Sequence, residues 1–260
     1  MAGQTISLFR YLLLGVVNRR LAILIVILWV LSSLVASFVS ELAIINSENM
    51  SAALQADFLR YSLVLVVLLL VTSNVAEDYQ SKQFERLLTM PISRWQYIIA
   101  QLLVILTIVT LLSLPVAGML SWATSFDIAL YWAAALWLEL VLVALIGLLG
   151  ILSLEKIPQA VIFSIAIYLL AKFSAVINQM LSESVKLSDG SASNRFAQWL
   201  FEGVLYVMPG TEAFAQNNVF FDPSLLSADL LPSQLLTVVI YAAFLVGVCL
   251  VDFYRKEFNL

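Results

Sequence analysis

Long apolar stretches alternate with short polar connections along most of this 260-residue chain. An α-helix needs about 20 mainly apolar residues to cross roughly 30 Å of hydrocarbon. Six stretches fit this description, and the predicted spans are residues 21–40, 58–76, 97–119, 128–152, 157–177 and 233–251. Only helices and closed barrels satisfy their backbone groups in lipid, and the alternation typical of barrel strands is not seen. The pattern predicts an all-α, polytopic membrane protein with a single transmembrane domain over residues 1–260.

Three segments outside these spans have patterns of their own. Residues 5–18 are apolar around Arg10 and too short to cross, which favours an amphipathic helix along the inner interface, with a ragged extension of the first span as the alternative. Residues 77–91 form a charged, helix-favouring connection between spans two and three that stops at Pro91. Residues 178–232 are the sizeable extramembrane region, and their turn residues and short apolar runs predict loops and short outer helices.

Basic residues gather on one side of the predicted membrane. Six spans put both termini on the same side, where the connections and termini hold nine Lys and Arg against three on the other side. The nine are Arg10, Arg19, Arg20, Lys82, Arg86, Arg94, Lys156, Arg255 and Lys256. The positive-inside rule therefore predicts a multi-pass membrane protein with both termini and the 77–91 connection in the cytoplasm. The formal net charge of −4 argues against nucleic acid as a partner.

Composition narrows the function classes further. The chain is 62% hydrophobic and 12% charged, and it contains no histidine. Serine–histidine dyads and histidine metal sites are thereby excluded. The sequence also lacks a Gly-x-x-x-x-Gly-Lys-Ser/Thr motif, so it has no P-loop to bind nucleotide. We therefore expect no enzyme activity, and no metal or cofactor bound by this chain itself.

Two ionisable residues lie deep inside predicted spans, Glu139 in the fourth and Lys172 in the fifth. A charge at that depth is costly unless it is paired or hydrated. Two interpretations stay open: a structural ion pair between adjacent helices, or a lining of a translocation path or subunit contact. Arg60 lies near one end of the second span, where its long side chain is expected to reach the interface. The aromatics expected to form interfacial belts are Trp95, Trp122, Tyr131, Trp132 and Trp199.

The order of these parts resembles the membrane subunit, or permease, of type-2, exporter-like ATP-binding-cassette (ABC) transporters. Members begin with a cytoplasmic interfacial helix, which matches Phe9-Arg10-Tyr11 and Asn18-Arg19-Arg20 here. Their loop after the second span is acidic, continues as Glu-x-Leu-Leu-x-x-Pro and ends with a basic–aromatic start to the third span. The corresponding residues are Glu77-Asp78, Glu85-Arg86-Leu87-Leu88-Thr89-Met90-Pro91 and Ser93-Arg94.

The resemblance covers the topology of essentially the whole chain but only about 20 residues in motif. The chain departs from the family pattern at two places. A glycine commonly precedes the glutamate of the loop, whereas this chain has Gln80-Ser81-Lys82-Gln83, and a lysine frequently found early in span three is Gln101 here. These departures leave the subfamily open.

The resemblance implies a function and a set of partners. In the family the loop is a coupling helix that docks on the ATPase subunit, which implies coupling contacts at Asp78, Glu85, Arg86 and Arg94. The chain is then the transmembrane subunit of an ATP-driven exporter in a bacterial-type cytoplasmic (inner) membrane, paired with a second copy of itself or a related permease. Separate P-loop ATPase subunits hold ATP and Mg²⁺, and a periplasmic or outer-face protein is a further candidate partner. The alternative is a non-transporting membrane scaffold that recruits a cytoplasmic complex or acts mechanically on an envelope protein.

Overall fold

The regular elements that the structure describes are all helical. The computed structural model describes residues 9–13, 21–42, 47–80, 94–173, 180, 196, 199, 203, 211, 214, 216–226 and 230–255. The named helices are α2 (Leu21–Leu42), α3 (Ser47–Gln80), α5 (Arg94–Ala123), α6 (Phe126–Leu154), α7 (Ile157–Lys172), α10 (Asn218–Phe221), the 3₁₀ helix η2 (Pro223–Leu225) and α11 (Leu230–Arg255). The prediction of an all-α fold is confirmed for this part of the chain.

Four of these helices are long and apolar enough to cross a membrane. They are α3, α5, α6 and α11, with apolar windows that hold at most two charged residues. The apolar helical stretches found in α2 and α7 are shorter, at Val26–Phe38 and Ile157–Lys172. Several apolar helices of this kind indicate a membrane protein. The count of six crossings, and the side on which the termini lie, stay predictions.

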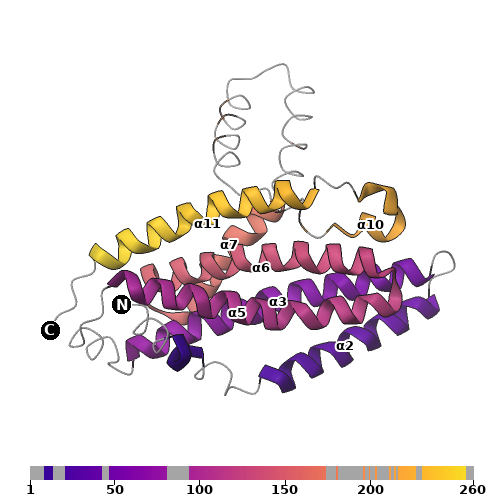
Figure 1. Ribbon diagram of the computed structural model, residues 1–260, viewed down its shortest axis with the longest axis horizontal. Helices are drawn as coiled ribbons and strands as arrows, with labels where there is room; N and C mark the ends of the chain where they lie inside the picture. Colours follow the sequence, from indigo (N-terminus) through magenta and orange to yellow (C-terminus); the bar gives the residue numbers. More distant parts are fainter. Residues whose placement is uncertain are drawn as a thin grey trace.

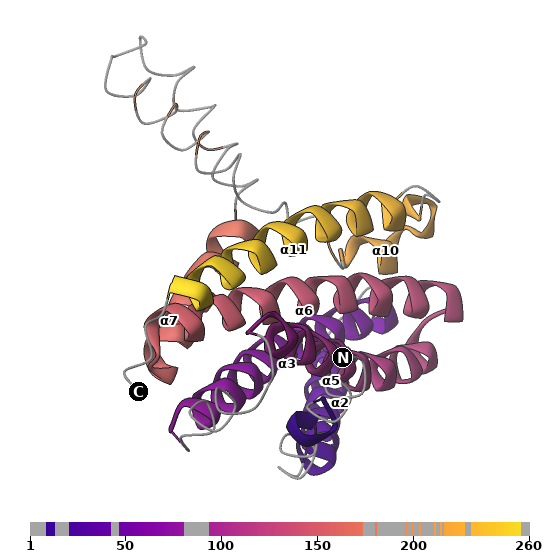
Figure 2. The ribbon, with the colours of Figure 1, turned by 60° about the vertical axis from the view of Figure 1, so that its left-hand side comes forward.

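Helix α6 lies in the middle of the bundle, between α11 on one side and α3 and α5 on the other (Figures 1 and 2). Most of its side chains are buried along its whole length. Helix α2 packs on α3 at the far side of the bundle from α11. A helix that is apolar all round must be covered on every side by protein or lipid, and α6 meets this condition through its neighbours.

Two glycines let the neighbouring helices approach α6 closely. A Cβ at Gly150 would lie 3.2 Å from the carbonyl oxygen of Ala160 and 3.1 Å from Ser164 Oγ, both on α7. A Cβ at Gly147 would lie 3.0 Å from a methyl group of Leu68 on α3. Helix α6 then ends at Glu155, whose left-handed backbone (φ 61°) closes the turn into α7. The short turn places α6 and α7 side by side.

Helix α3 is longer at both ends than the predicted second span. It begins at Ser47, in a segment whose mean hydropathy is too low for a predicted span. Small residues there, such as Ala52 and Ala56, are fully buried and pack this first part of the helix into the bundle. It continues to Gln80, so the first four residues of the predicted coupling helix, 77–80, belong to α3. The rest of that element, 81–91, lies outside the described residues.

Other predicted elements are described only in part. Residues 9–13 of the predicted 5–18 helix are helical, and Leu12 there is buried. Within the 178–232 segment, helices α10 and η2 match the expectation of short helices, and most of the remainder lies outside the described residues. Pro115 lies inside α5, which continues to Ala123.

Candidate functional site

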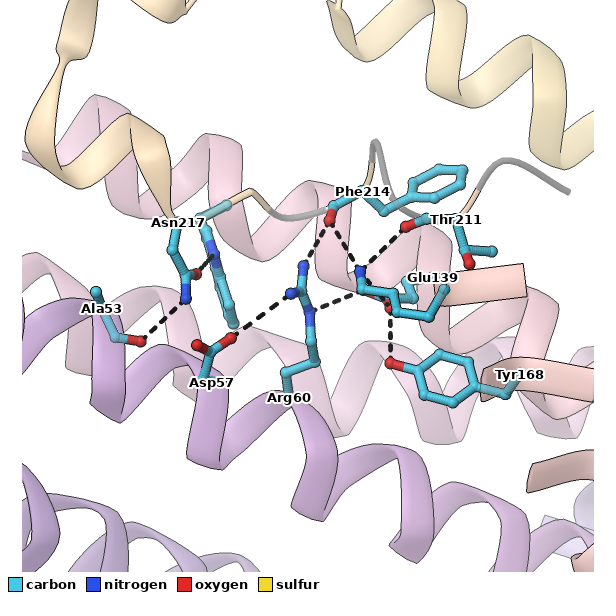
Figure 3. Close-up of polar contacts among 10 residues, drawn as sticks. Ala53, Asp57, Arg60, Glu139, Tyr168, Thr211, Phe214 and Asn217 are labelled. Atoms are coloured by element: carbon cyan, nitrogen blue, oxygen red, sulfur yellow. Dashed lines mark hydrogen bonds and ion pairs between the residues drawn. The ribbon is translucent and has the colours of Figure 1, made fainter. Parts of the chain in front are cut away.

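A cluster of charged side chains is buried where α3, α6 and α7 meet (Figure 3). Glu139 of α6 has no exposed side-chain surface and forms two ion pairs. Its Oε1 lies 3.2 Å from Lys172 Nζ of α7, and its Oε2 lies 3.1 Å from Arg60 Nε of α3. An isolated carboxylate in such a place loses several kcal/mol of hydration, so two cations on opposite oxygens are what allow it to stay charged.

Tyr168 supplies a further contact to the same carboxylate. Its hydroxyl donates a hydrogen bond to Glu139 Oε1 at 2.9 Å. Tyr168 and Lys172 are four residues apart on α7, and that spacing puts both side chains on one face of the helix. The last turn of α7 therefore presents a phenol and an ammonium group together to a single oxygen atom on α6.

The two cations also bind the backbone of the segment before α10. Lys172 Nζ donates to the carbonyl oxygen of Thr211 at 3.1 Å and to that of Phe214 at 3.4 Å. Arg60 Nη2 donates a hydrogen bond to the same Phe214 oxygen at 2.5 Å. Thr211 and Phe214 are both buried. The cluster thus supplies donors to two buried carbonyl groups, and the Thr211 oxygen also accepts the Phe214 backbone N–H at 3.1 Å.

Trp132 and Asn217 extend the contact toward α10. The Arg60 guanidinium lies 5.6 Å from the centre of the Trp132 ring, a cation–π arrangement. Trp132 Nε1 donates to Asn217 Oδ1 at 3.2 Å, and Asn217 Nδ2 donates to the carbonyl oxygen of Ala53 at 3.3 Å. Figure 3 shows Asn217 between Ala53 and Arg60 along α3. Thr211, Phe214 and Asn217 are therefore tied to α7, α3 and α6 respectively.

Asp57 stands at the edge of the cluster. The Asp57 Oδ1 atom lies 3.6 Å from Arg60 Nη1, and the two residues are one turn apart on α3. The Asp57 side chain is 38% exposed. Together with Glu139 it balances the charges of Arg60 and Lys172, so the four side chains carry no net charge. Neutrality favours an internal tie over an anion site, because no excess positive charge remains to attract a ligand.

The structure brings Glu139 and Lys172 together, as one of the two open sequence interpretations expected. The expectation for Arg60 was wrong, since its side chain is 5% exposed and points into the bundle. The reason is the earlier start of α3 at Ser47, which puts Arg60 about three and a half turns inside the helix. The expectation that Trp132 belongs to an interfacial belt was also wrong, because its side chain is fully buried.

The predicted coupling residues fall in different places. The Asp78 side chain is buried and accepts a hydrogen bond from the Tyr97 hydroxyl at 2.8 Å, so it joins α3 to α5. Glu85 and Arg86 lie outside the described residues. Arg94 is the first residue of α5, and only its backbone is described. Of the four, only Asp78 has a described side chain, and that side chain lies inside the bundle.

Sequence reasoning did not place Arg60, Asp57 or Tyr168 in the cluster. A signal was present for Arg60, since it is a third ionisable residue adjoining an apolar run. The sequence held no such signal for Tyr168, because a tyrosine inside an apolar helix is common. The carbonyl groups of Thr211 and Phe214 have no sequence signature at all.

The arrangement is suited to holding segments together. Both oxygens of Glu139 lie against cations and are shielded from solvent, as suits a structural ion pair between helices. Among the described residues there is no group of three His, Cys, Asp or Glu side chains placed to hold a metal ion. Comparison of the chain with protein-family models and with curated proteins finds no match.

Proposed function

We propose that this chain is the transmembrane subunit of an ATP-driven ABC exporter, which forms the translocation path and couples it to separate ATPase subunits. The observation that carries the proposal is the contact between Asp78 and Tyr97. It joins the end of α3 to the start of α5 at the base of the charged 81–93 connection. A force applied to that connection would reach both helices together, as the resemblance to a coupling helix requires.

Helix α3 links this contact to the buried cluster. Asp78 and Arg60 lie on the same unbroken helix, about 27 Å apart at 1.5 Å per residue. Arg60 in turn holds the Phe214 carbonyl and Glu139. Displacement of α3 at the Asp78 end would therefore change the contacts of Phe214 and Glu139 at the Arg60 end. In this proposal the contacts with the ATPase subunit fall to Glu85, Arg86 and Arg94, while Asp78 transmits the displacement.

The first experiment is gentle purification of the chain from its native membrane, with co-purifying proteins identified by mass spectrometry. A P-loop ATPase is expected with the wild type and is expected to be lost when Glu85 and Arg86 are both changed to alanine. The matched control is Glu155→Asn with Lys156→Ala in the exposed α6–α7 turn, where asparagine tolerates the left-handed backbone. Retention of the ATPase by the first variant would contradict the docking site. Absence of the ATPase from the wild type and from both variants would contradict the proposal.

A non-transporting scaffold is the second candidate, and the cluster itself favours it. The charges of Glu139, Lys172, Arg60 and Asp57 balance within the cluster, which suits a permanent structural tie. Spin labels on α3 and α11 distinguish the two functions in the purified complex. An ATP-dependent change in the distance between labels at Leu65 and Val239, both exposed, supports a transporter. An unchanged distance, with the ATPase bound and active, supports a scaffold.

A further inference from the structure

A groove runs between α2 and α5, with α3 as its floor. Its volume is about 500 Å³. The lining residues are Trp29, Ser33 and Ala36 of α2, Gln55 of α3, and Pro115, Gly118, Met119, Trp122 and Ala123 of α5. The volume is within the roughly 300–1,000 Å³ that small-molecule sites occupy. We call this feature the α2–α5 groove.

The groove opens toward the outside of the bundle. Trp122 on its rim is 94% exposed, and Leu114, one residue before the lining residue Pro115, is 66% exposed. A Cβ built at Gly118 meets no atom within 4 Å, so this part of α5 borders open space. Both α3 and α5 are candidate membrane spans. In a bilayer, the surroundings of this opening are therefore lipid.

Two polar side chains, Gln55 and Ser33, meet in the groove. Gln55 is 8% exposed, and its amide donates a long hydrogen bond of 3.4 Å to Ser33 Oγ. It lies about 12 Å along α3 from Ser47, at 1.5 Å per residue. An amide both donates and accepts, and none of the described lining residues is charged. The groove is thus suited to an apolar chain that carries an uncharged acceptor.

We propose that the α2–α5 groove binds one acyl chain of a membrane glycerolipid, with the ester carbonyl of that chain accepting a hydrogen bond from Gln55. An empty apolar groove would forfeit the dispersion contacts of its walls, and water would find few partners there. A phosphate group would bring a charge that no described lining residue balances. The chain and its ester group match both the apolar walls and the amide. This inference requires only that the protein lies in a membrane.

The test uses the full chain in phosphatidylcholine vesicles in which one acyl chain carries a photoreactive diazirine. Mass spectrometry then maps the lipid adducts. Adducts at Gln55 and Met119 are expected in the wild type. Gly118→Leu should fill the open space and abolish them, while adducts on the exposed face of α11 at Leu236 persist as an internal reference.

Gly247→Leu is the matched control. Gly247 lies on α11, and a Cβ there also meets nothing within 4 Å, so the substitution has the same chemistry away from the groove. Groove adducts are expected to survive in this variant. Adducts at Leu236 with none at Gln55 or Met119 in the wild type would overturn the proposal. Covalent links between two chains through groove residues would overturn it as well, because a second copy would then be the occupant.

The role of the amide has its own measurement. Photoreactive lipids with ester-linked and ether-linked chains are compared in otherwise identical vesicles. One neutral hydrogen bond corresponds to a preference of about fivefold for the ester at the groove. Gln55→Leu should remove that preference while groove labelling continues. Equal labelling by the two lipids in the wild type would refute the hydrogen bond to Gln55.

Discussion

Arg60 Nε lies 3.1 Å from Glu139 Oε2, and this ion pair joins α3 to α6 where both side chains are buried. Lys172 completes the arrangement from α7 at 3.2 Å from the other oxygen of the same carboxylate. Glu139 is therefore shared by three helices. Removing it would leave two cations inside the protein without their main partner.

The first prediction concerns that carboxylate. Glu139→Gln keeps the shape of the side chain but leaves Asp57 alone to balance Arg60 and Lys172, and it is expected to lower the free energy of unfolding by about 3–5 kcal/mol. Glu139→Leu combined with Lys172→Met should lower the free energy of unfolding by less than Glu139→Gln alone. Denaturant unfolding in detergent measures both. Glu41→Gln at the exposed end of α2 is the control, and an equal effect of all three would contradict the prediction.

The second prediction separates charge from geometry at Arg60. Arg60→Lys keeps the charge but cannot pair with Glu139, bind the Phe214 carbonyl and lie over Trp132 at once. Amide hydrogen exchange in residues 216–221 is expected to become faster. Arg255→Lys, in the exposed last turn of α11, should leave exchange there unchanged. Wild-type exchange rates in Arg60→Lys would show that the guanidinium does not hold this region.

The third prediction tests the contact beneath the charged connection. Asp78→Asn weakens the 2.8 Å hydrogen bond between α3 and α5, and Tyr97→Phe removes it. A double-mutant cycle on unfolding free energy is expected to give a coupling of about 1.5–3 kcal/mol, the range for a hydrogen bond to a charged group. Additive effects would mean that the two residues act independently.

The fourth prediction compares two glycines in α-helices. Gly150→Ala places a Cβ 3.2 Å from the Ala160 carbonyl and is expected to destabilise the protein by about 1–3 kcal/mol. Gly247→Ala meets nothing within 4 Å and should be neutral or stabilising by up to about 1 kcal/mol, because alanine favours helix. Thermal unfolding of the two variants under the same conditions checks the difference. The opposite order would contradict the packing of α6 on α7.

The fifth prediction is a pH effect at Asp222, before η2. Its carboxylate accepts hydrogen bonds from the Ser224 hydroxyl and backbone N–H, which lower its pKa below the usual 3.8. A lowered folded-state pKa means that the cap stabilises η2 above the unfolded pKa and is lost as pH falls through the folded value. NMR titration should show the low pKa, and Ser224→Ala should raise it toward 3.8. An unchanged pKa in that variant would assign the shift to another group.

Local sequence properties were sufficient for the helices and for part of the cluster. Apolar runs predicted where α5, α6 and α11 lie, because an unbroken apolar run has few other stable forms in lipid. Glu139 and Lys172 were recognisable because a charge within such a run needs a partner. The start of α3 was missed, because hydropathy does not register small residues such as Ala52 and Ala56 that pack tightly.

The sequence by itself determined the class of molecule: an apolar, helical, histidine-free chain with charged connections. Only the tertiary structure decided which groups meet. Arg60 turns inward, Asp78 bonds to Tyr97, and the Thr211 and Phe214 carbonyls bind cations from other helices. The physical reason is that hydropathy and helix period are properties of neighbouring residues. An ion pair between helices depends on their register and crossing, which the packing of α3, α6 and α7 sets.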